Sequence, residues 1–177
     1  MGVNLVAFFW GLAEATLFFI VPDVLLTHLA IKDPKRASKA CMWVLPGALI
    51  GGLVMYFWGA GDLKRAEEIM REIPAVDQEL LSAVEKQVVQ DGALSLFFGP
   101  MMARPYKTYS VYAGSTGVGL LAFVLISIPA RLSRFLILSW LTWWIAGKWL
   151  LKLDYRKKTF IWGAIWCSFY AWYFILL

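Results

Sequence analysis

Two carboxylates stand inside a long apolar stretch near the N-terminus. Glu14 and Asp23 lie in GLAEATLFFIVPD, and residues 3–31 contain no lysine or arginine. Roughly 20 apolar residues are enough to cross a bilayer, so both acids fall within a candidate membrane segment. A charged side chain at the centre of a membrane helix costs about 2.5–3.5 kcal/mol on the insertion scale. Carboxylates kept at such a place indicate a functional site, which could exchange a proton or bind a charged solute.

The spacing of the two acids predicts a break in the helix. Nine positions at about 100° per residue place Glu14 and Asp23 on opposite faces of a straight helix. Pro22 lacks an N–H and disfavours the helical conformation at Val21, which predicts that the chain folds back there. We expect a re-entrant hairpin over residues 1–31 that directs both carboxylates into an enclosed polar site. The alternative is one unbroken helix, with Asp23 near the headgroups and Glu14 packed against a neighbour.

A second interrupted segment, residues 92–114, carries positive charge. Arg104 and Lys107 are three positions apart and would share a helical face, and Arg suits bidentate contact with a phosphate or carboxylate. Broken segments in corresponding places of two halves are typical of a transporter site. The alternative is that both basic side chains reach toward headgroups from a helix end. The residues predicted to break helices are Pro22 in the first segment and Gly99, Pro100 and Pro105 in the second.

The composition is that of a polytopic membrane protein. Of the 177 residues, 60% are hydrophobic, 16% are charged and 10 are tryptophans. The net charge of +5 comes from basic residues between the apolar segments, where they anchor helices, and this argues against nucleic-acid binding. Cys41 and Cys167 form no disulfide framework and no metal-ligand spacing, and His28 is interpreted as a packed residue. We therefore expect neither a metal nor a cofactor.

One membrane domain is expected over residues 1–177. After the first hairpin, residues 40–61 predict a membrane helix, and residues 62–91 predict amphipathic helices at the membrane surface. The second hairpin follows, and residues 115–177 predict C-terminal membrane helices. The predicted fold class is thus an all-α integral membrane protein, a multi-pass helical bundle with two re-entrant, broken hairpins and a surface amphipathic region.

The charges do not give one consistent topology. The basic stretches 31–39 and 152–158 both have the character of cytoplasmic loops, whereas the acidic region 62–91 has that of an external one. Separate crossings at 108–130 and 135–151 would nevertheless place the two basic stretches on opposite sides. Either one of the last segments does not cross, or residues 92–130 contain one more pass.

These residues resemble the DedA or VTT-domain membrane proteins, a family that includes SNARE-associated Golgi protein homologues. Glu14, Pro22 and Asp23 match the family's pattern of a glutamate, a proline-containing stretch and a second acid nine positions on. FFGPMMARPYKTYSVYAG is similar to the family's second signature in its glycine, its final Ala-Gly and the 15-residue interval from Gly99 to Gly114. GALIGGLVMYFWGAG, residues 47–61, resembles the glycine-rich helix between the two signatures.

The second signature departs from the family pattern at three positions. Pro100 and Tyr106 occupy the family's two arginine positions, and Ala103 its usual proline position. Arg104 and Lys107 flank the second arginine position without occupying it, which indicates a divergent branch. The resemblance therefore implies a role for the two acids directly and for the basic pair only as neighbouring substitutes.

Two further arginines follow in ARLSRF, where the resemblance would lead one to expect a glycine-rich helix start. Arg131 and Arg134 are three positions apart on one helical face. They could supply the phosphate-binding charge that Pro100 and Tyr106 lack. The alternative is that they anchor a helix at its cytoplasmic end.

The resulting hypothesis is a transporter that moves an anionic lipid, a polyprenyl phosphate or a glycerophospholipid, between leaflets of a bacterial or archaeal inner membrane. Glu14 and Asp23 would couple this movement to protons, while Arg104, Lys107, Arg131 and Arg134 would contact the headgroup. No nucleophile–base pair or nucleotide loop predicts an enzyme. Two alternatives remain: a proton-coupled exporter of small cations, and a non-transporting assembly factor. Gly47 and Gly51, four positions apart, indicate a close helix contact or a homo-oligomer.

Overall fold

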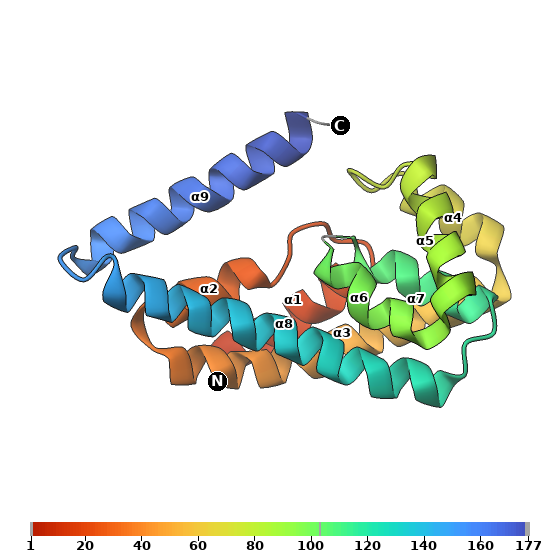
Figure 1. The fold of residues 1–177 in the computed structure, drawn as a ribbon, viewed down its shortest axis with the longest axis horizontal. Helices are drawn as coiled ribbons and strands as arrows, with labels where there is room; N and C mark the ends of the chain where they lie inside the picture. The colour runs from red at the N-terminus through yellow and green to blue at the C-terminus, as the bar shows by residue number, and fades with distance from the viewer. Residues whose placement is uncertain (1, 103, 176–177) are drawn as a thin grey trace.

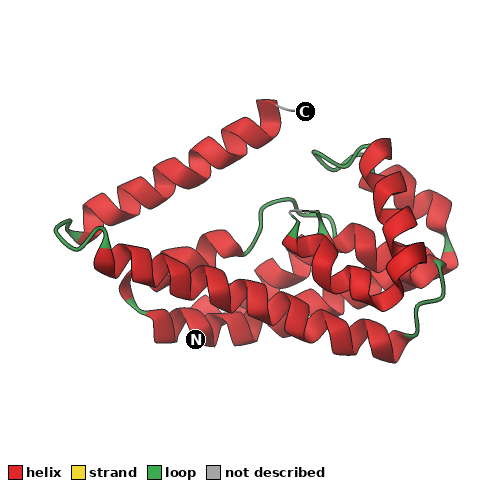
Figure 2. Ribbon diagram, viewed as in Figure 1, coloured by secondary structure: helices red, strands yellow, loops and turns green. Residues whose placement is uncertain are grey.

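The computed structural model describes residues 2–102 and 104–175, and all regular structure in these residues is helical, without strands (Figures 1 and 2). The all-α prediction is confirmed. Ala103 and the last two residues of the predicted C-terminal region lie outside the described residues. The elements are α1 (Gly2–Ala15), α2 (Asp23–Lys32), α3 (Pro34–Gly61), α4 (Leu63–Met70), α5 (Gln78–Asp91), η1 (Gly92–Leu94), α6 (Ser95–Met101), α7 (Tyr106–Ser115), α8 (Leu120–Lys148) and α9 (Tyr155–Ile175).

Two long antiparallel helices, α3 and α8, form the axis of the fold (Figure 1). Near one end of the pair the Tyr56 hydroxyl donates to the Val118 carbonyl, and near the other the Trp140 indole donates to Ser38. Both helices are long and apolar enough to cross a membrane. The α3 helix starts at Pro34 rather than at residue 40, because Asp33 caps it by accepting hydrogen bonds from the next free amides.

The first hairpin consists of α1 and α2, and the predicted break between Glu14 and Asp23 is present. The α1 helix already ends at Ala15, not at Val21, and residues 16–22 form the turn. Proline restricts only itself and its immediate predecessor, so Pro22 marks where α2 starts but not where α1 stops. The α2 helix then returns to the beginning of α3.

Glycines on α3 allow α1 to lie directly on it. A Cβ at Gly47 would stand 2.0 Å from the Phe8 carbonyl oxygen, and one at Gly51 would stand 2.7 Å from that of Leu12. The two helices run parallel, because later residues of α1 meet later residues of α3. The small-residue pattern at Gly47 and Gly51 therefore serves a contact within the chain.

The second hairpin, α6 and α7, places its break later than predicted. Gly99 and Pro100 lie inside α6, so their prediction as helix breakers is wrong. Pro100 falls in the last turn of α6. Its missing amide hydrogen bond therefore affects only the end of the helix. Gly99 instead makes room for a ring, since a Cβ there would stand 2.0 Å from Cζ of Tyr109. Pro105, which precedes the first residue of α7, does mark the break.

The two hairpins approach α3 from opposite ends. A Cβ at Gly52 would meet the Tyr106 ring, whereas one at Gly114 would stand 1.9 Å from the Tyr56 carbonyl oxygen, so α7 runs along the second half of α3. The first arm of each hairpin packs on the long helix of its own half, and the second arm on that of the other half. The series α1–α2–α3 and α6–α7–α8 are thus two inverted copies of one arrangement, and their turns meet near the middle of α3.

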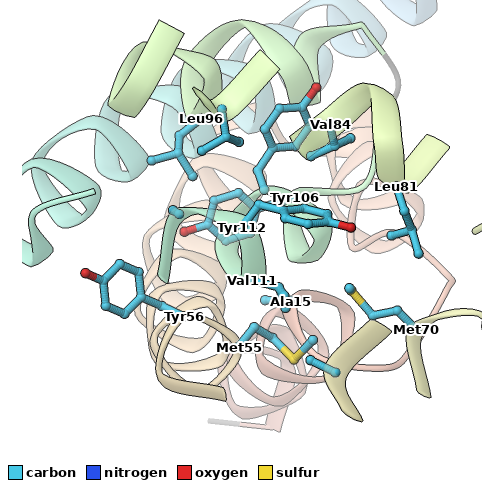
Figure 3. Close-up of a cluster of buried hydrophobic side chains, with 14 of the residues drawn as sticks. Ala15, Met55, Tyr56, Met70, Leu81, Val84, Leu96, Tyr106, Val111 and Tyr112 are labelled. Atoms are coloured by element: carbon cyan, nitrogen blue, oxygen red, sulfur yellow. The ribbon is translucent and has the colours of Figure 1, made fainter. Parts of the chain in front are cut away.

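The acidic region folds as two amphipathic helices, as predicted, joined around Pro74. Met70, Leu81 and Val84 are fully buried and join the main hydrophobic core with Tyr112 and Met55 (Figure 3). The charged residues of both helices lie mainly on the outer faces. These helices cover α7, so they brace the second hairpin from outside.

The predicted separate crossings at 108–130 and 135–151 are wrong. Residues 106–115 form only the short α7, and α8 runs unbroken through Pro129 and ARLSRF. The two arginines in that motif lie opposite carboxylates, so they do not force a helix end. With one long helix fewer, the stretches 31–39 and 152–158 come to the same end of the fold, where Tyr155 reaches His28 (Figure 1).

The α9 helix stands apart from the bundle (Figure 1). None of its residues is buried. It is joined to the first hairpin by hydrogen bonds and aromatic contacts. The Trp162 and Trp166 indoles donate to Thr27 at 3.0 and 3.2 Å, and the Tyr170 hydroxyl accepts from the Val21 amide at 3.0 Å. The Phe19 ring packs edge-on against the rings of Tyr170 and Phe174. A helix held by side chains at one face packs less closely than a helix whose backbone lies against glycines of its neighbour.

Candidate functional site

The site lies where the turns of the two hairpins meet α8. Glu14 is the last residue but one of α1, and Asp23 is the first residue of α2; 5% and 1% of their surfaces are exposed. A carboxylate at a helix N-terminus faces unpaired amides, which favours Asp23 at this position. Because of the turn between α1 and α2, both carboxylates face the same site, whereas a straight helix would have placed them on opposite faces.

Glu14 forms a buried ion pair with Arg131 of α8. Only 2% of Arg131 is exposed, and its guanidinium lies over the rings of Tyr106 and Phe135, at 4.6 and 5.0 Å from their centroids. The Tyr106 hydroxyl donates to Oγ of Ser127 at 2.8 Å. Arg131 is therefore enclosed by a carboxylate and two aromatic rings, an arrangement suited to holding helices together.

Asp23 forms a second ion pair, with Arg134, at 2.8 Å. The other terminal nitrogen of Arg134 donates to the Pro100 carbonyl at the end of α6, at 3.3 Å. One arginine thus joins α8 to both hairpins. About a quarter of this side chain is exposed, in contrast to Arg131, and the second carboxylate oxygen of Asp23 is buried without a hydrogen-bond partner among the described residues.

Lys107, the second residue of α7, is buried and forms no ion pair among the described residues. Its ammonium donates to the Phe18 carbonyl in the turn of the first hairpin, at 2.7 Å, and 3% of the residue is exposed. Within the described residues no carboxylate oxygen lies within 4.0 Å of this nitrogen. An ammonium satisfied by one carbonyl keeps donors free for a further acceptor.

Arg104 lies at the far side of the site. Its guanidinium donates to Gln87 of α5 at 2.8 Å, and the Tyr109 hydroxyl donates to the same amide oxygen at 2.6 Å. Arg104 therefore fastens the second hairpin to the outer helix pair and forms no ion pair within the part of the chain that the structure describes.

A central cavity of about 500 Å³ opens between the two hairpin turns, α8 and α9. Its walls carry two acidic and three basic side chains, together with apolar and aromatic ones. The charged lining residues are Glu14, Asp23, Arg104, Lys107 and Arg134. Arg131 lies behind Glu14 and does not line the cavity.

The acids of the first hairpin and the bases of the second line one cavity, but the ion pairs of the two acids are formed with a third element. Both acids pair with α8, because Arg131 and Arg134 project from one face of a continuous helix. Tyr106, which counted as a departure from the family pattern, supports the Arg131 guanidinium. No spacing rule could reveal the Gln87 or Phe18 contacts, since both depend on tertiary packing. Residues 2–102 and 104–175 contain no group of three or more side chains suited to a metal ion.

Fold and site together define an all-helical protein in which two opposed hairpins close on a cluster of buried charges. Comparison with known proteins places the chain beside an uncharacterized protein of Haemophilus influenzae, to which it is 30% identical over 176 residues, or 96% of this chain and 89% of that protein. An uncharacterized protein of Histophilus somni is 26% identical over 163 residues, which cover 90% and 84% of the two chains. The chain belongs to the same family as the Haemophilus influenzae protein. No family model matches it, and no solved structure does.

Proposed function

We propose that the protein is a DedA-like integral membrane protein that moves an anionic lipid between the two leaflets. The observation that carries this proposal is Lys107, a buried cation that lines the central cavity and lacks a carboxylate partner among the described residues. A buried charge is costly unless something compensates it. A phosphate headgroup entering the cavity would supply the missing negative charge.

The outer surface supports a bilayer setting. Large apolar side chains are exposed along α3 and α8, for example Phe57, Leu121 and Leu125, of which 59%, 72% and 59% are exposed. Extended apolar faces of this kind suit lipid rather than water. In this setting α3 and α8 cross the membrane, and the hairpins enter it from opposite sides, with their irregular turns enclosed by protein as bilayer physics requires.

The charge balance of the cavity favours an anion. Each acid already has an arginine, so Lys107 and Arg104 leave the site with an excess of positive charge. Arg134 is the partly exposed member of the pairs, and Arg groups bind phosphate oxygens in a bidentate way. Lys107 and Arg134 would hold the headgroup, whereas Arg131, outside the cavity, would hold the helices. A cation exporter would need both carboxylates free of these partners.

Protons would enter through Asp23. Protonation of this carboxylate would break its ion pair with Arg134 and leave the arginine free to bind the headgroup. Deprotonation would restore the ion pair, and the headgroup would dissociate. The two inverted halves provide the symmetry that alternating access to a central site uses. Glu14, which pairs with Arg131 behind it, would keep the two halves together during this exchange.

The test is the leaflet exposure of a labelled anionic lipid in liposomes that contain the purified protein. Wild type should accelerate the movement, and Lys107→Gln and Arg134→Gln should each slow it about tenfold, because a hydrogen bond to a charged group contributes about 1.5–3 kcal/mol. Lys64→Gln, on the exposed face of α4, is the matched control and should move lipid at the wild-type rate.

Three results would contradict the proposal. One is a wild-type protein without effect on lipid exposure, which would fit an assembly factor. Another is an unchanged rate in Lys107→Gln. The third is a proton-driven flux of a small cation without lipid movement, which would establish the exporter instead.

A further inference from the structure

An apolar groove adjoins the central cavity on the other side of the first hairpin turn. It lies between α1 and α9, has a volume of about 860 Å³, and is within the size range of ligand sites in proteins. No charged side chain lines it. The lining is mostly aromatic and aliphatic, and includes Phe9, Trp10, Val24, Trp162, Gly163 and Cys167.

The groove and the cavity are neighbours that share part of their lining. Phe18, Phe19, Trp166 and Tyr170 line both, so the turn of the first hairpin and the face of α9 are shared walls. A polar group in the lining of the groove has its hydrogen-bond partner within the protein: the Trp10 indole donates to the Ile20 carbonyl at 2.9 Å. A charged cavity therefore lies directly beside a groove that offers almost no polar contact.

We propose that this groove binds the hydrocarbon tail of the lipid whose headgroup occupies the central cavity. The inference rests on the proposed function and specifies its substrate: an anionic amphiphile with a long tail held by protein rather than left in the bilayer. Charge complementarity selects the headgroup end, and the wall residues shared by the two spaces place the groove where the tail of the same molecule would lie. A second copy of the chain or a peptide would leave the excess positive charge of the adjoining cavity unmatched.

Gly163 provides a way to fill the groove without disturbing the rest of α9. A Cβ at this position would meet nothing within 4 Å, although the residue lines the groove. Gly163→Trp should therefore occupy the space of the tail. Gly147→Trp is the matched control, because a Cβ there also meets nothing within 4 Å, and this part of α8 lines neither space.

The experiment compares two ligands with one type of headgroup. The first ligand is a labelled lipid with a hexadecyl chain and a phosphate headgroup. Gly163→Trp should slow its movement between the leaflets of liposomes about tenfold, because the tail loses an apolar contact region. Its binding of butyl phosphate, which is too short to reach the groove, should equal that of wild type in titration calorimetry. Gly147→Trp should behave as wild type in both measurements.

Cys167 gives a second readout that needs no variant. Its thiol is exposed in the groove, whereas Cys41 is buried. Hexadecyl phosphate should slow alkylation of Cys167 in nanodiscs severalfold, and butyl phosphate should leave the rate unchanged.

The outcomes separate the two proposals. If wild type moves lipid and Gly163→Trp does so at the same rate, or if hexadecyl phosphate leaves Cys167 unprotected, the groove is not the tail site while the proposed function stands. If wild type neither moves lipid nor binds butyl phosphate, the proposed function fails and this inference fails with it. Loss of butyl phosphate binding in Gly163→Trp would show a displaced helix and overturn the groove assignment.

Discussion

The Lys107 ammonium donates a hydrogen bond to the main-chain carbonyl of Phe18, 89 positions earlier in the chain, and so joins the turns of the two hairpins at 2.7 Å. Carbonyls just beyond a helix C-terminus lack helical partners, and cations favour that position. The same relation recurs between Arg134 and the Pro100 carbonyl at the end of α6. The C-terminal end of the first arm of each hairpin is thus met by a cation that also faces the cavity.

The Glu14–Arg131 pair should be structural. Glu14→Leu would leave a buried guanidinium unpaired, and we expect a loss of about 3–5 kcal/mol in the free energy of unfolding. The double variant Glu14→Leu/Arg131→Leu should lose less than the sum of the single variants, because no uncompensated charge remains. Denaturant unfolding in detergent micelles measures both.

Glu68→Gln is the control for this prediction, since Glu68 pairs with Arg65 on the surface of α4 at 3.3 Å. An exposed pair contributes about 0–1 kcal/mol, so the variant should unfold nearly as wild type does. Equal stability of the wild type and Glu14→Leu would show that the buried pair contributes nothing.

The Asp23–Arg134 pair should govern how anion binding depends on pH. If protonation of Asp23 releases Arg134, acid conditions should tighten the binding of butyl sulfate, a probe whose own charge stays constant. Asp23→Asn removes the titrating group, so binding should be at least as tight as in wild type at low pH and independent of pH. Titration calorimetry at several pH values measures this, and a pH dependence retained in Asp23→Asn would assign the proton to another residue.

The glycine seams along α3 should be intolerant of a methyl group. Gly114→Ala and Gly47→Ala place a Cβ within about 2 Å of a main-chain carbonyl, so the helices must separate, at an expected cost of about 1–3 kcal/mol. Gly147→Ala has open space around it and should instead stabilise α8 by about 0.5–1 kcal/mol. Thermal unfolding of the purified variants should give shifts of opposite sign, and parallel shifts would contradict the seam.

The fold places both basic stretches at one end and the acidic helices at the other, and this predicts the orientation. In a Cys41→Ala/Cys167→Ala background, cysteines at Arg36 and Arg156 should be shielded from an impermeant maleimide in intact cells, as expected for basic cytoplasmic loops. A cysteine at Glu79, exposed on α5, should react. Labelling of Arg36→Cys without Arg156→Cys would mean that α8 does not return antiparallel to α3.

The hairpins could be predicted because their signals are local. The angular separation of Glu14 and Asp23, and the backbone restrictions of Pro22 and Pro105, all act within a few residues. The amphipathic period over residues 62–91 is equally local. These features gave the all-helical class and the two interruptions, while the exact end of α1 depended on turn contacts that the pattern does not contain.

The continuity of α8 and the role of Gly99 could not be predicted, because both depend on partners distant in sequence. Arg131 and Arg134 look like a helix boundary until Glu14 and Asp23 are placed opposite them. Gly99 looks like a helix breaker until the ring of Tyr109 is placed against it. In each case the same residue type is compatible with two structural roles, and the role depends on which residue packs against it in the fold.

The close contact of α3 with α1 and α7, main chain against main chain, also limits where the molecule can bend. Interdigitated backbones slide only at great cost, so α3 with one arm from each hairpin should behave as a rigid post throughout any working cycle. The adjustable parts are then α9 and the turn that follows α8, since α9 is joined to α2 and to the turn of the first hairpin, which lie outside the post. Restraining α9 by a cross-link, with the post untouched, should stop the proposed lipid movement.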